Sequence, residues 1–206
     1  MRTLVVGSQA LLIELDSADE VAALHAELLR RRDAGGLGPV RDLVPAARTV
    51  LLDGVRDPAA LGDRIARWEV PPLAAAEGPQ VTVAVRYDGP DLAEVARLWG
   101  VDTGEVPGIV GATPFRVAFC GFAPGFGYLT GLPERLHVPR RDSPRTAVPA
   151  GSLALAGEYA GVYPRSSPGG WQLIGSTDAV LWDPARDPAA LFAPGVQVRF
   201  TEAGRD

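Results

Sequence analysis

Apolar and polar residues along the first 70 positions follow two patterns, one typical of strands and one typical of helices. Short apolar runs at residues 4–6 and 11–15 predict strands. Ser17 and Glu20 have the spacing of a capping box. The apolar residues that recur every three or four positions after them predict a helix that ends at Gly35.

The rest of this region continues the same mixture of elements. Strands are predicted near residues 40–44 and 48–52, followed by a second helix that Asp57 caps and Pro58 begins. Trp68 is predicted to face inward with this helix. Together these elements predict a small α+β domain.

Residues 70–79 are rich in Pro, Gly and Ala without sustained periodicity, which is typical of a linker. We therefore predict two domains, residues 1–76 and 77–206. The second opens with a strand over 81–87 and a helix over 92–99. Short apolar runs between Gly/Pro-rich turns follow at residues 116–119, 153–156, 171–174 and 196–200. The predicted fold class is α+β, with a small N-terminal α/β-sandwich-like domain followed by a closed or nearly closed β-barrel.

The composition is that of an ordinary soluble globular protein, with 47% apolar and 22% charged residues. Apolar runs stay well below the roughly 18 residues that span a membrane, and the first residues lack the features of a signal peptide. We expect a cytoplasmic protein without membrane contact. The net charge of -5 gives no general field for binding nucleic acid.

All twenty basic residues are Arg, and Cys120 is the single cysteine. Without Lys the chain can form neither the phosphate loop of nucleotide-binding enzymes nor a Schiff base. An anion site must therefore use Arg side chains, backbone N–H groups or helix N-termini. One cysteine excludes an internal disulfide and a multi-cysteine metal site, and we predict no metal ligands.

The most unusual segment, residues 119–133, combines aromatic residues with turn-forming Gly and Pro. Phe122, Phe126 and Tyr128 would line a wall, while glycines such as Gly125, beside Pro124, let the backbone approach a ligand closely. The alternative is a tightly turned loop packed on one end of the barrel. We expect this loop to converge there with the turn that carries Trp171.

A second candidate is a group of three Arg residues within six positions, Arg140, Arg141 and Arg145. Guanidinium forks suit a carboxylate or a phosphate, and the alternative is a solvated face. Hydroxyl and amide donors in nearby turn-rich stretches are further candidates, with turn formation as their alternative role. These further candidates are Ser152, Tyr163, Ser167, Gly169 and Gly170.

No catalytic residue is assigned. We reject a Cys120 and His137 nucleophile pair, because Cys120 continues an apolar run as a buried small residue and His137 lies in a loop without an acidic partner at an informative spacing. No ligand spacing for zinc recurs, and the sequence has no Gly-x-Ser-x-Gly elbow for hydrolysis.

Several blocks in one order resemble the B subunit of 5-oxoprolinase, whose family is also named allophanate hydrolase subunit 1 and includes a sporulation histidine-kinase inhibitor. The blocks lie at residues 41–45, 87–92, 121–133, 139–145, 148–152 and 163–175. The resemblance implies a cyclophilin-like barrel. It also implies a non-autonomous part of an ATP-dependent enzyme that opens 5-oxoproline to L-glutamate, using ATP together with Mg²⁺. The implied partners are proteins similar to the A and C subunits of 5-oxoprolinase.

Two positions depart from the family pattern. Many relatives carry a His shortly before the strand near Phe115, where this chain has Ile109, Val110 and Gly111, and a common Gly-Asp step is Gly7-Ser8 here. If that His transfers protons, this chain has altered activity or a scaffold role. The alternative functions are a histidine-kinase inhibitor and a carboxyltransferase-like module related to allophanate hydrolase and urea carboxylase.

Overall fold

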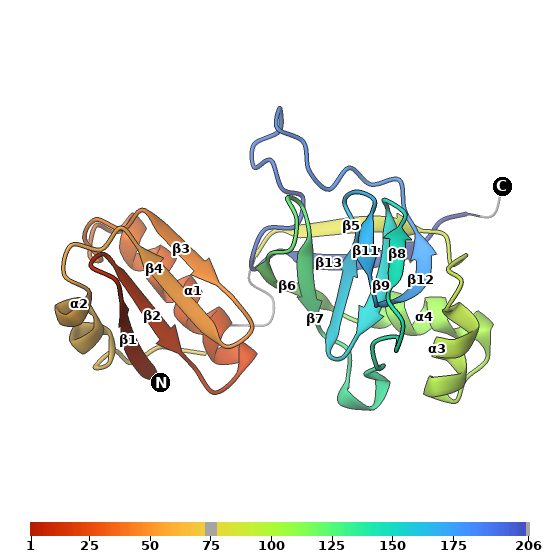
Figure 1. Cartoon of the computed structure of the whole chain (residues 1–206), viewed down its shortest axis with the longest axis horizontal. Coiled ribbons are helices and arrows are strands. Elements are labelled where there is room, and N and C mark those ends of the chain that lie inside the picture. Colours follow the sequence, from red (N-terminus) through yellow and green to blue (C-terminus); the bar gives the residue numbers. More distant parts are fainter. Residues whose placement is uncertain (73–77, 205–206) are drawn as a thin grey trace. The chain divides into compact units, whose positions relative to one another are not determined.

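A computed structural model describes residues 1–72 and 78–204 of the chain. The chain divides into two compact units, Met1–Glu77 and Gly78–Asp206, and each is described by itself (Figure 1). The predicted domain boundary between residues 76 and 77 lies outside the described residues. Within those residues, no helix has the length and apolar character needed to cross a membrane.

The N-terminal unit is an antiparallel sheet with two helices packed on one face. Its strands are β1 (Arg2–Val6), β2 (Ala10–Glu14), β3 (Asp42–Pro45) and β4 (Thr49–Asp53), in the order β1-β2-β4-β3. Helices α1 (Ala18–Asp33) and α2 (Pro58–Ile65) bury their apolar sides against the inner residues of β2 and β4. Alternate residues of a strand face opposite sides of the sheet, which is why β2 and β4 are buried at every second position.

The predicted helix starts are confirmed, with one difference. Ser17 Oγ accepts a hydrogen bond from the Glu20 N–H at 3.2 Å, and Asp57 Oδ1 accepts one from the Ala60 N–H at 3.0 Å. The Glu20 carboxylate accepts from the N–H of Asp16 and not from that of Ser17, so the reciprocal half of the capping box is displaced by one residue.

Trp68 lies beyond the end of α2 and packs against the N-terminal core from there. The Arg31 guanidinium stacks on the Trp68 ring at 3.9 Å, a cation–π contact that joins α1 to the segment after α2. Trp68 is partly buried and covers one side of the N-terminal core.

The C-terminal unit is built on a seven-stranded sheet in the order β12-β9-β10-β7-β6-β13-β5. Its strands are β5 (Gln80–Val85), β6 (Phe115–Cys120), β7 (Gly127–Thr130), β9 (Ser152–Ala156), β10 (Tyr159–Val162), β12 (Gln172–Ser176) and β13 (Gln197–Glu202). Next to β5 and at the end of β12, Arg86 and Ser176 exchange two backbone hydrogen bonds of 2.8 Å, so the sheet nearly closes on itself. The predicted α+β fold with a nearly closed barrel is confirmed.

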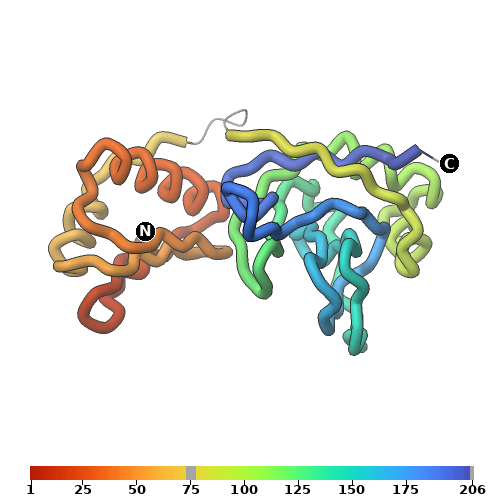
Figure 2. The backbone as a smooth tube through the Cα atoms, turned by 90° about the horizontal axis from the view of Figure 1, so that it is seen from above, coloured from red at the N-terminus to blue at the C-terminus, as the bar shows by residue number. Residues whose placement is uncertain are grey.

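Strands β5 and β13 are parallel and run side by side along one edge of this unit (Figure 2). Helices α3 (Leu92–Trp99) and α4 (Val106–Ala112) and the 3-10 helices η1 (Thr103–Glu105) and η2 (Glu134–Leu136) pack beside the sheet, and β8 (Arg145–Val148) pairs with β11 (Ser167–Gly169). Gly100, with a φ of 69°, ends α3 as expected.

Val110, near the position where the family resemblance predicts a His, falls inside the core of the barrel unit. Val110 lies on α4, is fully buried, and belongs to the same apolar cluster as Phe115 and Phe200. A neutral Val suits this site because an unpaired imidazole there would lose its hydration.

Candidate functional site

Aromatic side chains from separate segments of the barrel unit gather around Phe126. Its ring centroid lies 5.0 Å from that of Tyr128, 5.3 Å from Phe122, 5.4 Å from Tyr163 and 5.6 Å from Trp171, all edge to face. Ring quadrupoles favour this geometry. We call these five residues the aromatic cluster. The predicted convergence of the 122–128 loop with Trp171 is confirmed.

Burial divides the aromatic cluster into a framework and one exposed member. Phe126, Tyr163 and Trp171 are 2%, 3% and 6% exposed, whereas Phe122 is 56% exposed. The backbone of Phe122 also has a φ of 65°, a left-handed conformation that bulky residues seldom adopt and that surrounding structure must hold. The cluster therefore acts mainly as a rigid support that presents Phe122.

The loop between β6 and β7 is shorter than the sequence indicated. Gly127 and Tyr128 belong to strand β7, which leaves residues 121–126 as the turn. Pro124 is exposed on this turn, and Gly125 is buried with a φ of 85°. A Cβ atom on Gly125 would lie 2.9 Å from the Cβ of Trp182, so glycine is required there by both conformation and space.

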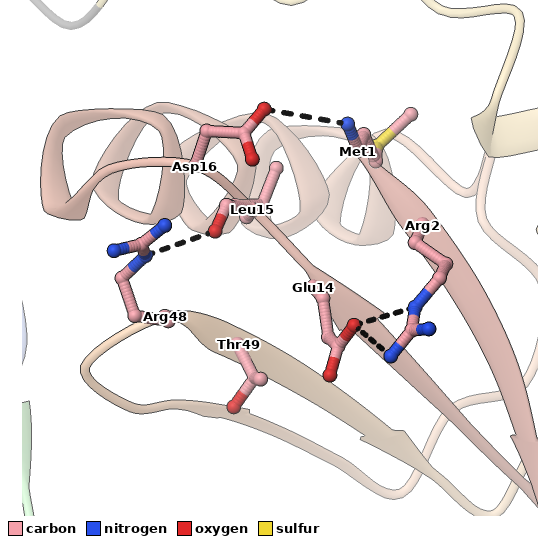
Figure 3. Close-up of a pocket in the computed structure, with 7 residues that line it drawn as sticks. All are labelled: Met1, Arg2, Glu14, Leu15, Asp16, Arg48 and Thr49. Atoms are coloured by element: carbon pink, nitrogen blue, oxygen red, sulfur yellow. Dashed lines mark hydrogen bonds and ion pairs between the residues drawn. The ribbon is translucent and has the colours of Figure 1, made fainter.

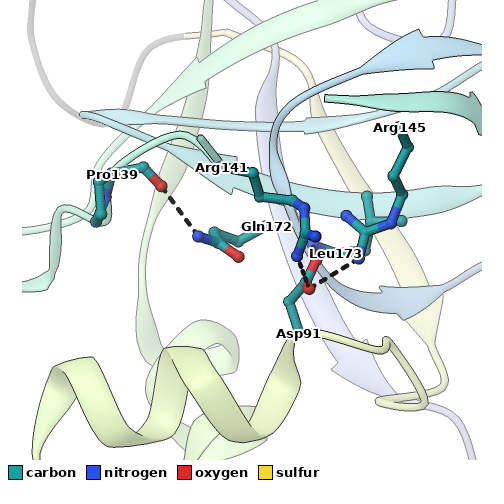
Figure 4. Close-up of polar contacts among 6 residues, drawn as sticks. All are labelled: Asp91, Pro139, Arg141, Arg145, Gln172 and Leu173. Atoms are coloured by element: carbon teal, nitrogen blue, oxygen red, sulfur yellow. Dashed lines mark hydrogen bonds and ion pairs between the residues drawn. The ribbon is translucent and has the colours of Figure 1, made fainter. Parts of the chain in front are cut away.

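Two of the three predicted Arg residues converge on a buried carboxylate that sequence reasoning missed (Figure 4). Asp91 is 4% exposed, and its Oδ1 accepts from Arg141 Nη1 at 2.7 Å and from Arg145 Nη2 at 2.8 Å. Its Oδ2 accepts from the Leu173 N–H at 2.7 Å. Arg140 is exposed beside them. We call Arg140, Arg141 and Arg145 the Arg edge.

The charges of this site act on both Asp91 and the aromatic cluster. Burial alone would raise the pKa of Asp91, but the hydrogen bonds from Arg145 and the Leu173 N–H and the charges of both Arg residues outweigh it, so the pKa lies below its usual value. Burial raises the pKa of Tyr163, and the charges of Arg140 and Arg145 oppose this. Arg145 pairs with Gly169, and Gly169 lies against the Tyr163 ring, so the Arg edge and the aromatic cluster are adjacent.

The predicted hydroxyl donors are used within their own turns. Ser152 Oγ donates to the Pro149 carbonyl at 2.8 Å, and Ser167 Oγ donates to the Arg165 carbonyl at 3.2 Å. Ser152 is also only 5% exposed. In this structure both serines stabilise turns.

The predicted glycines fix the backbone around the site. A Cβ atom on Gly169 would collide with the Tyr163 hydroxyl oxygen, so only glycine lets β11 approach the ring this closely. The Gly170 carbonyl accepts from the Arg141 N–H at 2.8 Å, which anchors the main chain of one member of the Arg edge.

The expectation that Cys120 is buried is wrong, because the residue is exposed at the end of β6. Its thiol is partly shielded and donates to the Phe192 carbonyl at 3.1 Å, and burial raises the pKa of the thiol to about 11. His137 places its Nε2 3.1 Å from the Leu132 carbonyl oxygen. Neither group has the geometry of an activated nucleophile and its base.

Further cavities among the described residues lie outside this site. In the N-terminal unit, a pocket of about 470 Å³ is lined by residues that pair with one another (Figure 3). Arg2 and Glu14 form an ion pair of 2.5 Å, and Arg48 Nε donates a hydrogen bond to the Leu15 carbonyl. The Met1 amino group lies 3.9 Å from the Asp16 carboxylate. These charges are largely neutralised within the pocket. Another cavity, of about 680 Å³ in the barrel unit, is lined by residues 86–88 after β5, by Thr103 and Gly104 of η1, and by residues 202–204 at the end of β13.

Asp91 brings together parts of the chain that sequence alone leaves apart. It precedes α3, whereas its partners Arg141 and Arg145 lie 50 and 54 residues further along and Leu173 lies in β12. The local signal at residues 87–92 is a turn before a helix. That signal places Asp91 at a helix start but cannot show which cations it meets.

Comparison with known proteins defines the class. Residues 1–192 match the family model of the carboxyltransferase domain, subdomain C and D. The Kluyveromyces lactis urea carboxylase structure has a TM-score of 0.69 at 16% identity over 98% of this chain and 22% of that chain, which concerns the fold alone. The structure of TTHA0988 has a TM-score of 0.77 at 32% identity over 96% of this chain, and this chain spans 40% of its length. The protein is thus a carboxyltransferase-like α+β protein.

Curated relatives narrow this class. The B subunit of 5-oxoprolinase from Escherichia coli O157:H7 is 37% identical over 207 residues, covering 97% of this chain and 94% of that protein. The protein of the same name in Bacillus subtilis (strain 168) is 46% identical over 112 residues, covering 54% of this chain and 47% of that protein. The chain belongs to the family of 5-oxoprolinase B subunits.

Proposed function

We propose that this chain is one component of an ATP-dependent 5-oxoprolinase, which opens the lactam of 5-oxoproline to L-glutamate together with partners similar to the A and C subunits of that enzyme. The observation that carries the proposal is the Arg edge beside the aromatic cluster. A small substrate with a carboxylate and a ring that carries apolar methylene groups needs both kinds of surface in one place. The 37% identity to a named B subunit of 5-oxoprolinase, which extends over nearly the full length of both chains, supports the same assignment.

In this reaction the chain contributes binding and orientation. ATP, used with Mg²⁺ by the complex, would supply a phosphoryl group to the lactam oxygen, which makes the carbonyl carbon a better electrophile. Addition of one water and cleavage of the C–N bond then give the ring-opened acyl phosphate, and a second water releases phosphate and L-glutamate. The Arg edge holds a carboxylate through charge-assisted hydrogen bonds, and exposed Phe122 offers an apolar face. Water attack needs a base, and neither Cys120 nor His137 is placed as one.

We expect the isolated chain neither to hydrolyse ATP nor to open 5-oxoproline, because the sequence contains no Lys for a phosphate loop. The test is reconstitution with the partner proteins, measuring ATP-dependent glutamate formation with and without this chain. Glutamate formation that requires every component supports the proposal. Robust 5-oxoproline-dependent ATP hydrolysis by the single chain, or full activity without it, refutes it.

One observation favours a second function, a regulatory protein that binds a histidine kinase. Phe122 is more than half exposed on a backbone held in a strained conformation, and rigid exposed aromatic residues often anchor protein contacts. Replacing Phe122 with Ala should then abolish kinase binding in a pull-down assay while glutamate formation by the complex persists. Loss of glutamate formation with kinase binding unchanged would assign Phe122 to the enzyme complex instead.

A further inference from the structure

Asp91 sets both the geometry and the net charge of the Arg edge. We propose that Asp91 is a positioning residue that makes this edge select a single carboxylate over the polyphosphate of a nucleotide. The inference rests on the proposed function, because it names which of the two anionic reactants this chain would bind.

The Asp91 carboxylate is fixed on every side. One oxygen accepts from Arg141 and Arg145, the other accepts from the Leu173 N–H, and the Asp91 N–H donates back to the Leu173 carbonyl at 2.9 Å. The carboxylate is thereby tied to β12. A guanidinium group is planar, so one fixed N–H···O bond restricts the directions of its other donors.

The two Arg residues are also held from their main chains. Arg141 donates its N–H to the Gly170 carbonyl, and Arg145 is the first residue of β8, paired with Gly169 of β11. Both guanidinium groups are therefore anchored at two points, as a recognition site for a planar anion requires.

The Arg edge keeps donors that Asp91 does not use. Arg141 Nε and Arg145 Nη1 are buried and have no hydrogen-bond partner within residues 1–72 and 78–204. A covered donor without a partner costs free energy, and that cost is recovered if the guanidinium group turns toward an acceptor. The two cations also share one oxygen, and a further anion nearby would reduce their mutual repulsion.

The charge of the site fits one carboxylate. Within residues 139–145 and Asp91, three Arg stand against Asp91 and Asp142, which leaves one net positive charge. One carboxylate neutralises it, whereas a triphosphate would bring several uncompensated negative charges to a chain that already carries a net charge of -5. The Arg141 and Arg145 side chains remain 35% and 22% exposed, so a small solute can contact their exposed atoms, while Arg141 Nε and Arg145 Nη1 are covered.

The test is Asp91→Asn in the reconstituted complex, with KM measured separately for 5-oxoproline and for ATP. The substitution preserves shape but removes the charge that directs the two forks. We expect KM for 5-oxoproline to rise at least about tenfold, with KM for ATP changed less than about twofold. Asp178→Asn is the matched control, since Asp178 forms a bidentate pair with exposed Arg86, and it should change neither constant.

A second variant covers the case in which Asp91→Asn does not fold. Arg145→Lys keeps the charge but loses the fork, and it should likewise raise KM for 5-oxoproline selectively. A selective rise in KM for ATP in either soluble variant overturns the inference, and so does a lower melting temperature with both constants unchanged, because that is a structural role.

The failure of the proposed function gives a different result. If the complete wild-type complex forms no glutamate, the enzymatic proposal fails, and titration of 5-oxoproline and of inorganic tripolyphosphate into the purified chain decides this inference alone. Tighter binding of 5-oxoproline, reversed by Asp91→Asn, supports it. Tighter binding of tripolyphosphate, or no binding of either anion, overturns it.

Discussion

Phe126 and Phe122 lie four residues apart in one loop, and replacing each with Ala should have very different costs. Phe126 is 2% exposed and meets four rings at 5.0 to 5.6 Å. Removing a buried Phe side chain costs about 3–5 kcal/mol, and the ring contacts place this site in the upper half of that range. Phe122 is 56% exposed, so its replacement should cost no more than about 1 kcal/mol.

Urea unfolding measures both costs. Trp68 reports on the N-terminal unit and the other three Trp residues report on the barrel unit, so a Trp68→Phe background isolates the barrel signal. Each unit must be treated as its own transition. A loss below about 2 kcal/mol for Phe126→Ala, or equal losses for the two variants, would refute the assignment of Phe126 as the centre of a rigid support.

Three further predictions concern single residues. Gly169→Ala should destabilise the barrel unit by about 1–3 kcal/mol in urea unfolding. Because the Tyr163 hydroxyl is the nearest obstacle to a Cβ atom at residue 169, adding Tyr163→Phe should restore part of the lost stability, and a double variant with no recovery would contradict the prediction. Hydrogen bonds from Arg30 and Arg31 lower the pKa of Glu27 from 4.5 to about 2. The stability that ionised Glu27 adds to the fold is therefore complete above the unfolded pKa and is lost as pH falls toward about 2. Glu27→Gln should flatten that part of the curve of unfolding free energy against pH, and an unchanged curve would count against this prediction. Alkylation of Cys120 should stay slow at neutral pH and accelerate as pH approaches about 11, whereas fast alkylation near neutrality would contradict the raised thiol pKa.

The parts of the fold that could be predicted from the sequence are those specified by neighbouring residues. The caps at Ser17 and Asp57 and the terminating Gly100 act within one helical turn, so their signals are local. Helix α4 was missed because seven residues containing Pro107, Gly108 and Gly111 show too little periodicity.

Long-range features escaped sequence analysis for a different reason. Strand β7 begins at Gly127 inside a turn-rich segment, and its pairing with β6 and β10 decides its conformation. The Arg cluster was predicted from residue type as a candidate anion site, yet the anion that Arg141 and Arg145 contact in the fold is Asp91, 50 and 54 residues away. Side-chain partners at such separations depend on tertiary packing, which a single sequence does not display.

The parallel pairing of β5 with β13 has a consequence for synthesis on the ribosome. Strand β5 opens the barrel unit, and within residues 78–204 it pairs along its length with β13 alone, the last strand in that range. A nascent chain must therefore carry β5 with an unpaired edge until residues 197–202 have left the exit tunnel. The barrel therefore closes late. If translation stalls after β5 and before β13, the unpaired edge of β5 stays exposed and can act as a template for aggregation.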